Sequence, residues 1–567
     1  MQACEPAKSR LYVYVVYVEP AISRFRRSGS MLNSCLILLS LTLSLGIWPS
    51  CRGGTVAATA LPNPVDEDRP PGSPPELPRI FVELPAGSPG APTRVLSMGD
   101  DLQRAVDNAK PGDVIALQPG VFFKGPLTLT DKSGNGWITI RTNTPDASFP
   151  TPGTRVSPSH APLMPVIESD RDVAIIAEPG AHHYRFIGIE VRPPAGVFVG
   201  SLIALGGDNK SFETLPHDIV FERCYVHGDP QVGGRRGIAL NSRHTAVIDS
   251  YLADFKEHGN DSQAIAGWNG AGPFKIVNNY LEGAGENLMF GGADPDVQNL
   301  IPSDIEIRGN AFAKPLAWKG TQWSVKNIFE LKNARRVLID GNTFDNNWAD
   351  AQNGFAILFT PRNQDGSAPW SMVRDVTFTH NVVRHTGSAV NILGTDDLHP
   401  SQRTKRITIR DNIFEDVDGT KWGGAGRLFQ ILDGAADVVI DHNTATQTGD
   451  VLAGEGDPSS GLIFRNNLTP HNAYGVGGSN TYGNPAQALA TYFPGAVFIK
   501  NVLIGGRAEN YPPNNFFPPT ANDVRFVDAT DGDYRLADDS PYKAAGTDGK
   551  DIGANMDPKL RTRSVRH

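Results

Sequence analysis

The chain has 567 residues, a formal net charge of −9, 40% hydrophobic and 8% aromatic residues, 59 glycines and 44 prolines. This length predicts three or four domains of about 150 residues, unless the chain is built from repeats, which grow by adding units. The negative charge argues against a nucleic-acid-binding protein, which needs a basic face, but leaves room for a basic groove that binds a sugar.

Residues 1–60 have the layout of a targeting region. Three arginines at 24–27 precede an apolar run at 32–48, and small residues follow, as in a secretory signal. Met31 stands directly before the apolar run, so the stretch ahead of it fits an upstream mis-start. We expect export to the periplasm, the cell surface or the medium, with no membrane span in the mature chain. An uncleaved anchor helix, or a lipoprotein at Cys51, is the alternative.

The region that follows is a linker by composition. Residues 61–94 contain ten prolines, together with several glycines and serines, and are expected to be extended. Beyond the targeting region the chain has a single cysteine, Cys224, so a disulfide framework is excluded. The sequence contains no CxxC or HExxH motif, so it has no strong motif for a transition-metal site.

Residues 99–122 predict a short helix followed by a strand. An aspartate opens the segment, and Leu102, Ala105, Val106 and Ala109 fall on one helical stripe before Pro111-Gly112 ends the helix. An amphipathic helix of this kind suits the open end of a β-structure, where it covers unpaired strand edges.

A repeat occupies most of the remaining chain. Stretches such as "VLIDGNTFDN" and "ITIRDNIFED" have alternating apolar residues, a polar corner and a second short apolar pair. The steps between corners range from 24 to 39 residues, which is too irregular for helical hairpins, and the period of two predicts short strands. The corner residues are Cys224, Ser250, Asn279, Asn310, Asn342, Asn381, Asn412, Asn443, Asn467 and Asn501.

Strand–corner–strand units without intervening helices are best satisfied by a solenoid, whose turns stack about 4.8 Å apart. Asparagine suits the corner because it tolerates left-handed backbone angles and its amide can bond from turn to turn. We therefore predict an all-β fold, a right-handed single-stranded parallel β-helix over residues 95–505. The N-terminal helix caps it, and an irregular tail at 506–567 closes its other end.

The cap helix, the asparagine corners and the closing stretch "GDYRLADDSPYKAAGTDGKDIGA" (532–554) resemble the secreted right-handed parallel β-helix proteins. That superfamily includes pectate lyases, alginate lyases, chondroitinase B and polygalacturonases. The resemblance covers roughly residues 95–555 and implies the fold more firmly than the chemistry. It implies a polysaccharide as the partner, and we expect a monomer.

The catalytic motifs of these families match the sequence only in part. The Gly-His-Gly and Arg-Ile-Lys motifs of polygalacturonases are absent. In chondroitinase B and its alginate-lyase relatives a catalytic lysine precedes a corner asparagine, and "FELKNARRVLIDGNTF" is similar, with Lys332 at that place and Arg362 one turn later. The acidic pair that binds calcium in those lyases is missing, since Val325 and Asn327 stand there. Calcium is thus a possible cofactor only, and no cofactor is certain.

β-Elimination from a uronic acid needs a base for the proton next to the carboxylate and a cation that neutralises the carboxylate. We predict Lys332 as the base and Arg362 as the neutralising cation. Glu330 lies two residues before Lys332 on the same strand face and completes the predicted catalytic group. The alternative for Glu330 and Lys332 is an ordinary surface ion pair.

The predicted substrate contacts come from the same turns. Asn287, Asn391 and Gln430 are expected to align with Glu330 as an outward polar stripe, although a register error of one residue would turn a side chain away. Six of the eight tryptophans lie between residues 268 and 422, and they either stack on sugars or pack loops onto the solenoid. The candidates for sugar binding are Trp348, Trp370 and Trp422.

Two other functions stay open. A glycoside hydrolase needs two carboxylates at a defined separation, which Asp397 and Asp433 on neighbouring turns could provide. A non-catalytic carbohydrate-binding or surface solenoid would explain the missing family motifs. His182-His183 is expected to support a turn rather than to bind a metal.

Overall fold

The computed structural model describes residues 69–70 and 72–556. The predicted signal segment at 32–48, its cleavage region, Cys51 and the first residues of the Pro-rich segment lie outside the described residues. Within the described part of the chain, no helix is both long and apolar enough to cross a membrane.

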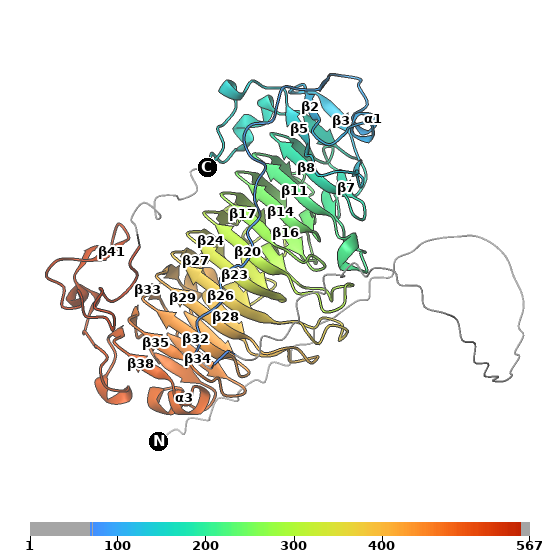
Figure 1. The fold of residues 1–567 in the computed structure, drawn as a ribbon. Coiled ribbons are helices and arrows are strands. Elements are labelled where there is room, and N and C mark those ends of the chain that lie inside the picture. Colours follow the sequence, from blue (N-terminus) through green and yellow to red (C-terminus); the bar gives the residue numbers. More distant parts are fainter. Residues whose placement is uncertain (1–68, 71, 557–567) are drawn as a thin grey trace, which may run out of the picture. The chain divides into compact units, whose positions relative to one another are not determined.

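The chain winds into a parallel β-helix of three sheets, and each strand pairs in parallel with the strand at the same position in the next turn (Figure 1). This confirms the predicted all-β solenoid. The sheets are numbered here in the order in which the chain visits them within a turn, and the corner residues lie between sheets 1 and 2.

Sheet 1 has 14 strands: β1 (Arg94–Leu96), β2 (Val114–Leu117), β5 (Ile138–Thr142), β8 (His182–Ile187), β11 (His217–Glu222), β14 (Arg243–Ile248), β17 (Phe274–Val277), β20 (Ser303–Arg308), β23 (Ala334–Asp340), β26 (Val373–Thr379), β29 (Lys405–Arg410), β32 (Ala436–Asp441), β35 (Ile463–Arg465) and β38 (Val497–Ile499). Sheet 2 has 13 strands: β3 (Phe122–Lys124), β6 (Val166–Glu168), β9 (Glu190–Arg192), β12 (Tyr225–His227), β15 (Tyr251–Phe255), β18 (Tyr280–Gly283), β21 (Ala311–Ala313), β24 (Thr343–Asn347), β27 (Val382–Thr386), β30 (Ile413–Val417), β33 (Thr444–Gln447), β36 (Leu468–Pro470) and β39 (Val502–Ile504). Sheet 3 has 12 strands: β4 (Leu127–Leu129), β7 (Ile175–Ala177), β10 (Ile203–Leu205), β13 (Arg236–Leu240), β16 (Gln263–Gly267), β19 (Glu286–Phe290), β22 (Phe329–Leu331), β25 (Phe355–Phe359), β28 (Ser388–Leu393), β31 (Phe429–Leu432), β34 (Leu452–Glu455) and β37 (Val476–Gly478). The α-helices among the described residues are α1 (Leu102–Asp107), α2 (Gly419–Trp422) and α3 (Pro485–Tyr492). The same part of the chain also has six short 3-10 helices: Asp146–Ser148, Pro158–Leu163, Phe212–Thr214, Leu316–Trp318, Ala508–Asn510 and Ala521–Val524.

The core runs down the inside of the three sheets. Alternate strand residues such as Val337 and Ile339 of β23 point inward and are fully buried, as the period-two pattern predicts. Aromatic rings stack from turn to turn, for example Phe312 on Phe344 with centroids 4.6 Å apart. Burial of each such side chain contributes about 1.5–3 kcal/mol to folding.

The predicted corner column is a continuous hydrogen-bonded ladder. The backbone N–H and the side-chain amide of Asn310 both donate to the Asn342 oxygen, at 2.9 and 3.0 Å. The left-handed residue, however, is the one before the asparagine, such as Gly341 with φ 66° and His380 with φ 53°. Asparagine is thus required for its amide, and its predecessor provides the bend.

Both ends of the solenoid are covered. Helix α1 is capped by the Asp101 side chain, which accepts the Arg104 N–H, and buries Leu102, Ala105 and Val106 as predicted. At the other end Leu489 and Tyr492 of α3 join the core, and the tail forms an antiparallel pair, β40 (Phe526–Asp528) with β41 (Asp533–Leu536). The tail packs Val524, Leu536, Tyr542 and Ile552 against the last strands of sheet 2.

The Pro-rich segment is extended, but it is bound to the solenoid. Residues 72–92, called the strap below, cross the outer face of sheet 1 as the blue trace in Figure 1. Backbone N–H groups of the strap donate to aspartates near the starts of sheet 1 strands: Gly72 to Asp437 (2.9 Å), Glu76 to Asp375 (3.1 Å) and Arg79 to Asp304 (2.8 Å).

Candidate functional site

The outward column of sheet 3 carries most of the polar residues predicted for the site. Glu330 in β22 pairs with Leu358 in β25, and the same register continues to Asn391 in β28 and Gln430 in β31. The expected alignment is therefore correct for Glu330, Asn391 and Gln430. In the preceding strand of the sheet, β19, Met289 occupies the corresponding position in this column.

Asn287 is a correction to the predicted stripe. Its side chain is fully buried and donates to the Leu281 and Ala313 carbonyl oxygens at 2.7 and 2.8 Å. Its own oxygen accepts from Lys314 Nζ at 3.1 Å. Asn287 therefore ties the corner between sheets 2 and 3 together, and it does not face a sugar on the sheet surface.

Lys332 and Glu330 lie side by side at the end of β22. Lys332 Nζ is 3.7 Å from Glu330 Oε1, with exposed side-chain fractions of 14% and 3%. The two oxygens of Glu330 also accept from Thr360 Oγ1 (3.1 Å) and Asn327 Nδ2 (3.2 Å). The carboxylate is thus buried and fixed, unlike one in an ordinary surface ion pair, and it orients an ammonium group that stays partly accessible.

A second acid lies behind this pair. Glu286, in β19, is fully buried and accepts from Gln263 Nε2 at 2.8 Å, while its Oε1 meets no partner among the described residues. Burial, reinforced by the charges of Asp261 and Glu330, raises the pKa of Glu286 to about 7.

A second ion pair, between Lys326 and Asp261, completes the cluster. Burial opposes the charge on Asp261, but Lys326 and Lys332 outweigh it and hold the pKa of Asp261 below its usual value. The carboxylates of Glu286 and Asp261 raise the pKa of Lys326 against the effect of burial. Two carboxyl groups, Asp261 and Glu286, therefore have pKa values pushed in opposite directions at one place on the solenoid.

Lys314 supports the cluster from inside. Its ammonium group is fully buried and donates to the carbonyl oxygens of Gly283 (2.6 Å), Ala284 (2.8 Å) and Gly285 (3.2 Å), directly before Glu286. Burial lowers the pKa of Lys314 to about 7, against the raising effect of Glu286. Lys314 thus holds the turn from which Glu286 and Asn287 project.

Arg362 lies one turn beyond Lys332, as expected, because its backbone N–H donates to the Lys332 carbonyl at 2.9 Å. Its guanidinium, however, contacts Asp396 at 2.7 Å and also Asp397. Two carboxylates therefore already match its charge. The predicted hydrolase acid Asp397 is engaged in this pair, and burial together with Asp457 raises the pKa of Asp433.

The predicted tryptophans mostly pack loops. Trp348 and Trp422, 3% and 7% exposed, form one buried cluster with Trp318 and Val325. Trp370 is half-buried and donates from Nε1 to the Leu300 carbonyl at 3.1 Å. Trp348 and Trp422 therefore pack loops onto the solenoid, and neither ring has an exposed face on which a sugar could stack.

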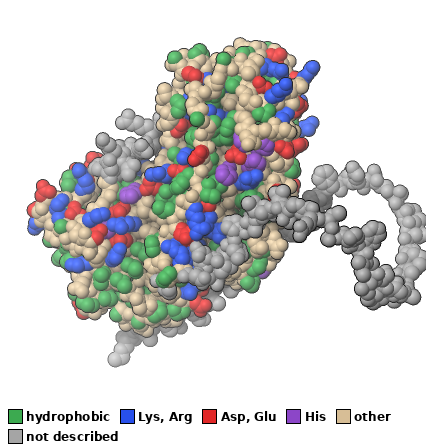
Figure 2. Space-filling model, in the orientation of Figure 1, with side chains coloured by type: hydrophobic (Ala, Val, Ile, Leu, Met, Phe, Trp, Pro, Cys, Tyr) green, Lys and Arg blue, Asp and Glu red, His purple; other side chains and the backbone are tan. Residues whose placement is uncertain are grey.

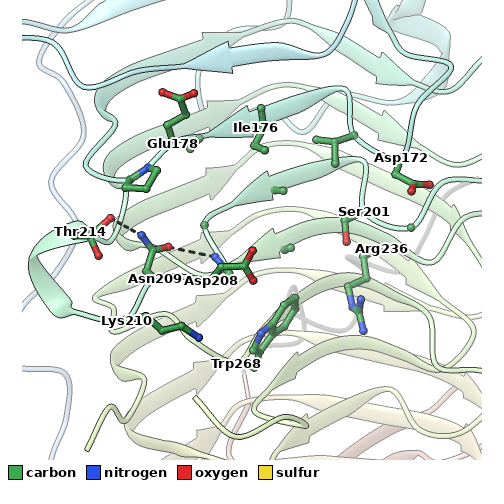
Figure 3. A pocket seen from close by; sticks show the side chains of 18 of the residues that line it. Asp172, Ile176, Glu178, Ser201, Asp208, Asn209, Lys210, Thr214, Arg236 and Trp268 are labelled. Carbon is green, nitrogen blue, oxygen red and sulfur yellow. Dashed lines mark hydrogen bonds between the residues drawn. The ribbon is translucent and has the colours of Figure 1, made fainter. Parts of the chain in front are cut away.

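A groove adjoins the cluster on the outer face of sheet 3 (Figure 3). It has a volume of about 830 Å³ and lies over β7, β10 and β13. Its floor is the column Ile176, Ala204 and Ala239, which continues through the sheet register to Glu330. The small side chains of Ala204 and Ala239 leave room above the sheet for a chain-like ligand.

Trp268 and Arg236 lie together at the end of the groove nearest the cluster (Figure 3). The Arg236 guanidinium lies over the Trp268 ring, 5.1 Å from its centroid. Arg236 Nε donates to Gln263 Oε1 at 3.0 Å, and Gln263 in turn donates to Glu286. This chain of hydrogen bonds links the groove to the buried acid.

Sequence reasoning missed Glu286, Gln263, Lys326 and Arg236 as site residues. They lie at strand starts and in the turns between sheets 2 and 3, where no asparagine corner fixes the register. The available signal was a polar residue recurring there in successive turns, in "DSQAI", "ENLMF" and "VKNIF".

The arrangement provides two ammonium groups, a fixed carboxylate and a carboxyl group that titrates near neutrality, beside a groove with an aromatic and a cationic wall. Such a set can neutralise an anionic substrate and move a proton.

No protein-family model and no curated protein matches the chain. Among solved structures it is similar to the catalytic unit of a GH87 α-1,3-glucanase from Streptomyces thermodiastaticus, with 13% identity, a TM-score of 0.44, and coverage of 74% of this chain and 70% of that one. It is also similar to a mannuronic-acid-specific polysaccharide lyase of family 6 from human gut microbiota (13%, 0.39, 73% and 87%) and to the pectate lyase Pel9A (14%, 0.34, 82% and 97%). At these identities the likeness concerns the parallel β-helix fold alone.

Proposed function

We propose that the protein is a polysaccharide lyase that cleaves a uronic-acid-containing glycan lying along the outer face of sheet 3. The observation that carries the proposal is the Lys332–Glu330 pair, set beside a second ammonium group and next to the groove of Trp268 and Arg236. Secretion, expected from the apolar segment at 32–48, belongs to the same proposal, since such polymers are extracellular or surface material.

In this proposal Lys326, which is paired with the single carboxylate of Asp261, shares its charge with the uronate carboxylate and makes the neighbouring C–H proton removable. Lys332 Nζ takes that proton, and Glu330 stabilises the ammonium group that forms. The electron pair forms the C4–C5 double bond, the C4–O bond breaks, and solvent protonates the leaving oxygen. Arg236 and Trp268 hold a neighbouring sugar unit, whereas Arg362, already bound by two aspartates, positions the loop behind Lys332.

The test is incubation of the protein with alginate, pectate and glycosaminoglycans, each with and without calcium. A lyase releases an unsaturated uronate that absorbs in the near ultraviolet. New reducing ends without that absorbance would replace elimination by hydrolysis. Binding of a polymer without any product would instead support a carbohydrate-binding solenoid.

Hydrolysis is the second candidate, and the opposed pKa shifts of Glu286 and Asp261 favour it. A carboxyl group with a pKa near 7 can donate a proton to a leaving sugar while an ionised neighbour assists, which is the division of labour in glycosidases. Under this alternative the rate falls as pH rises above about 7, where Glu286 loses its proton.

A further inference from the structure

A second group of chemically active side chains lies on sheet 1, outside the proposed site. The second residue of several sheet 1 strands has a left-handed backbone and is left out of the strand pairing, so its side chain turns toward the neighbouring strand. In β8, β11 and β14 these residues are His183 (φ 60°), Asp218 (φ 53°) and His244 (φ 48°).

In later turns the same position builds ion pairs between strands. Arg336 binds Asp304 through two bonds of 2.7 and 2.8 Å, and Arg406 binds Asp375 through two bonds of 2.6 and 2.7 Å. Each of these two buried carboxylates is thus matched by an arginine on the neighbouring strand, one turn later in the chain.

The early turns place histidines where the later turns place arginines. Asp218 forms no ion pair with a lysine or arginine among residues 69–70 and 72–556, and its partner is His217, with Nδ1 2.6 Å from Oδ2. Arg243 lies near enough to influence Asp218, but its guanidinium stacks over the Phe212 ring at 5.3 Å.

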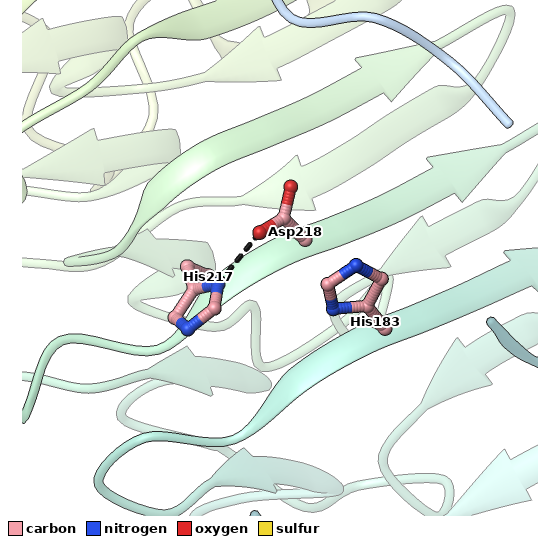
Figure 4. A group of neighbouring side chains, drawn as sticks. All are labelled: His183, His217 and Asp218. Carbon is pink, nitrogen blue, oxygen red and sulfur yellow. Dashed lines mark hydrogen bonds and ion pairs between the residues drawn. The ribbon is translucent and has the colours of Figure 1, made fainter. Parts of the chain in front are cut away.

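The side chains of His183, His217 and Asp218 converge (Figure 4), and one ligand atom from each lies within 4.8 Å of the others. Nitrogen and oxygen ligands lie about 2.0–2.2 Å from a bound zinc ion, so small side-chain rotations would close this spacing around an ion. All three residues are half-buried. Histidine side chains are gathered at the surface of the molecule in Figure 2.

A neighbouring contact chain prepares His183 as a ligand. His182 Nε2 is 3.2 Å from Asp131 Oδ1, and its Nδ1 is 2.7 Å from His183 Nδ1. With Asp131 accepting the His182 Nε2 proton, His182 Nδ1 accepts from His183, and a lone pair remains on His183 Nε2. A carboxylate behind a histidine commonly fixes the tautomer of metal ligands in this way.

We propose that His183, His217 and Asp218 bind a divalent transition-metal ion of the zinc type, which joins the consecutive strands β8 and β11. Imidazole nitrogens with one carboxylate suit Zn²⁺, Co²⁺ or Ni²⁺, whereas calcium requires a shell of oxygen ligands. The ion replaces the proton between His217 and Asp218 and supplies the positive charge that arginine supplies in later turns. The proposal departs from the expectation that His182-His183 supports a turn rather than binding a metal.

The test is calorimetric titration of the chelator-treated protein with Zn²⁺, together with visible absorption on adding Co²⁺. The wild type is expected to show one saturable site, and Zn²⁺ is expected to raise its Tm. His183→Ala and His217→Ala remove a ligand and should abolish the site. His182→Ala removes the contact that orients His183 and the ring that stacks on His217, 4.9 Å between centroids, but no ligand, and should weaken binding about 10- to 100-fold.

His258→Ala is the matched control, because His258 is exposed and lies outside the group. It should bind zinc like the wild type. A folded His183→Ala/His217→Ala variant that binds zinc with wild-type stoichiometry and affinity would overturn the proposal, as would a wild type that shows no saturable zinc binding. These readouts do not depend on the polysaccharide activity.

Discussion

The amide of Asn342 makes four hydrogen bonds inside the corner between sheets 1 and 2. Its oxygen accepts from the backbone N–H and the side-chain amide of Asn310, and its nitrogen donates to the Ile307 carbonyl (2.9 Å) and to the Asn381 oxygen (3.0 Å). A group of this size with both a donor and an acceptor is needed at each turn, which explains why the chain returns to asparagine.

Asn342→Leu should therefore destabilise the fold. Leucine has no polar group, so the Asn310 N–H and the Ile307 carbonyl stay buried without this partner, at a cost of about 1–3 kcal/mol each. Urea unfolding measures the loss, with Asn143→Leu, at an exposed position, as the control. A variant with an unchanged unfolding midpoint would refute the architectural role.

Glu286 makes stability depend on pH in a predictable direction. Its folded-state pKa, about 7, lies above the usual value of 4.5, so its favourable contribution is complete below about pH 4.5 and is lost as pH rises through about 7. Glu286→Gln removes this dependence. The variant should gain up to about 3 kcal/mol relative to wild type between pH 4.5 and 8.

The measurement is the free energy of urea unfolding of both proteins across that range. A difference between wild type and Glu286→Gln that stays constant with pH would show that Glu286 is not a perturbed acid. Glu178→Gln, at an exposed position on the rim of the groove, is the control and should show a constant difference.

Among the elements, the strap is the least expected. Its composition predicts an extended segment, and it is extended, but its attachment depends on aspartates in sheet 1 that are hundreds of residues away in sequence. Backbone N–H donors leave no mark in the sequence of the strap. The docking was therefore not predictable from composition.

Asp375→Ala should loosen the middle of the strap. Asp375 accepts the Glu76 N–H and two hydrogen bonds from Arg406, so its removal frees that amide and takes two charge-assisted hydrogen bonds from a buried arginine. Hydrogen exchange at Glu76 should accelerate. Asp365→Ala, in an exposed loop, should leave that exchange unchanged, and slow exchange at Glu76 in Asp375→Ala would contradict the attachment.

The strands also show where sequence reasoning about the site reaches its limit. In sheet 1 the corner asparagines fix the register, so the pattern reads correctly from turn to turn. The turn at Gly283–Gly285 carries no such marker, and Asn287 was placed on the surface where Met289 lies. The predicted alignment was therefore wrong at this turn, and Asn287, which was expected to contact the sugar, lies in the interior.

At the scale of the molecule, the fold was predictable because every turn repeats the same local chemistry. The site was predictable only in part, since Lys332 and Glu330 share a strand, whereas Glu286, Asp261 and Lys326 meet only after the solenoid has stacked. From the sequence alone, the tryptophans could either stack on sugars or pack loops onto the solenoid. The burial of Trp348 and Trp422 shows that these two pack loops.

The central claim is that the cluster on sheet 3 performs the cleavage. The most direct test is the rate of near-ultraviolet product release from a polymer that the wild type degrades, compared among wild type, Lys332→Ala and the exposed control Lys550→Ala. Loss of a general base should lower the rate of Lys332→Ala about 100- to 10,000-fold, while the polymer still binds. Product release by Lys332→Ala at the wild-type rate would contradict the account.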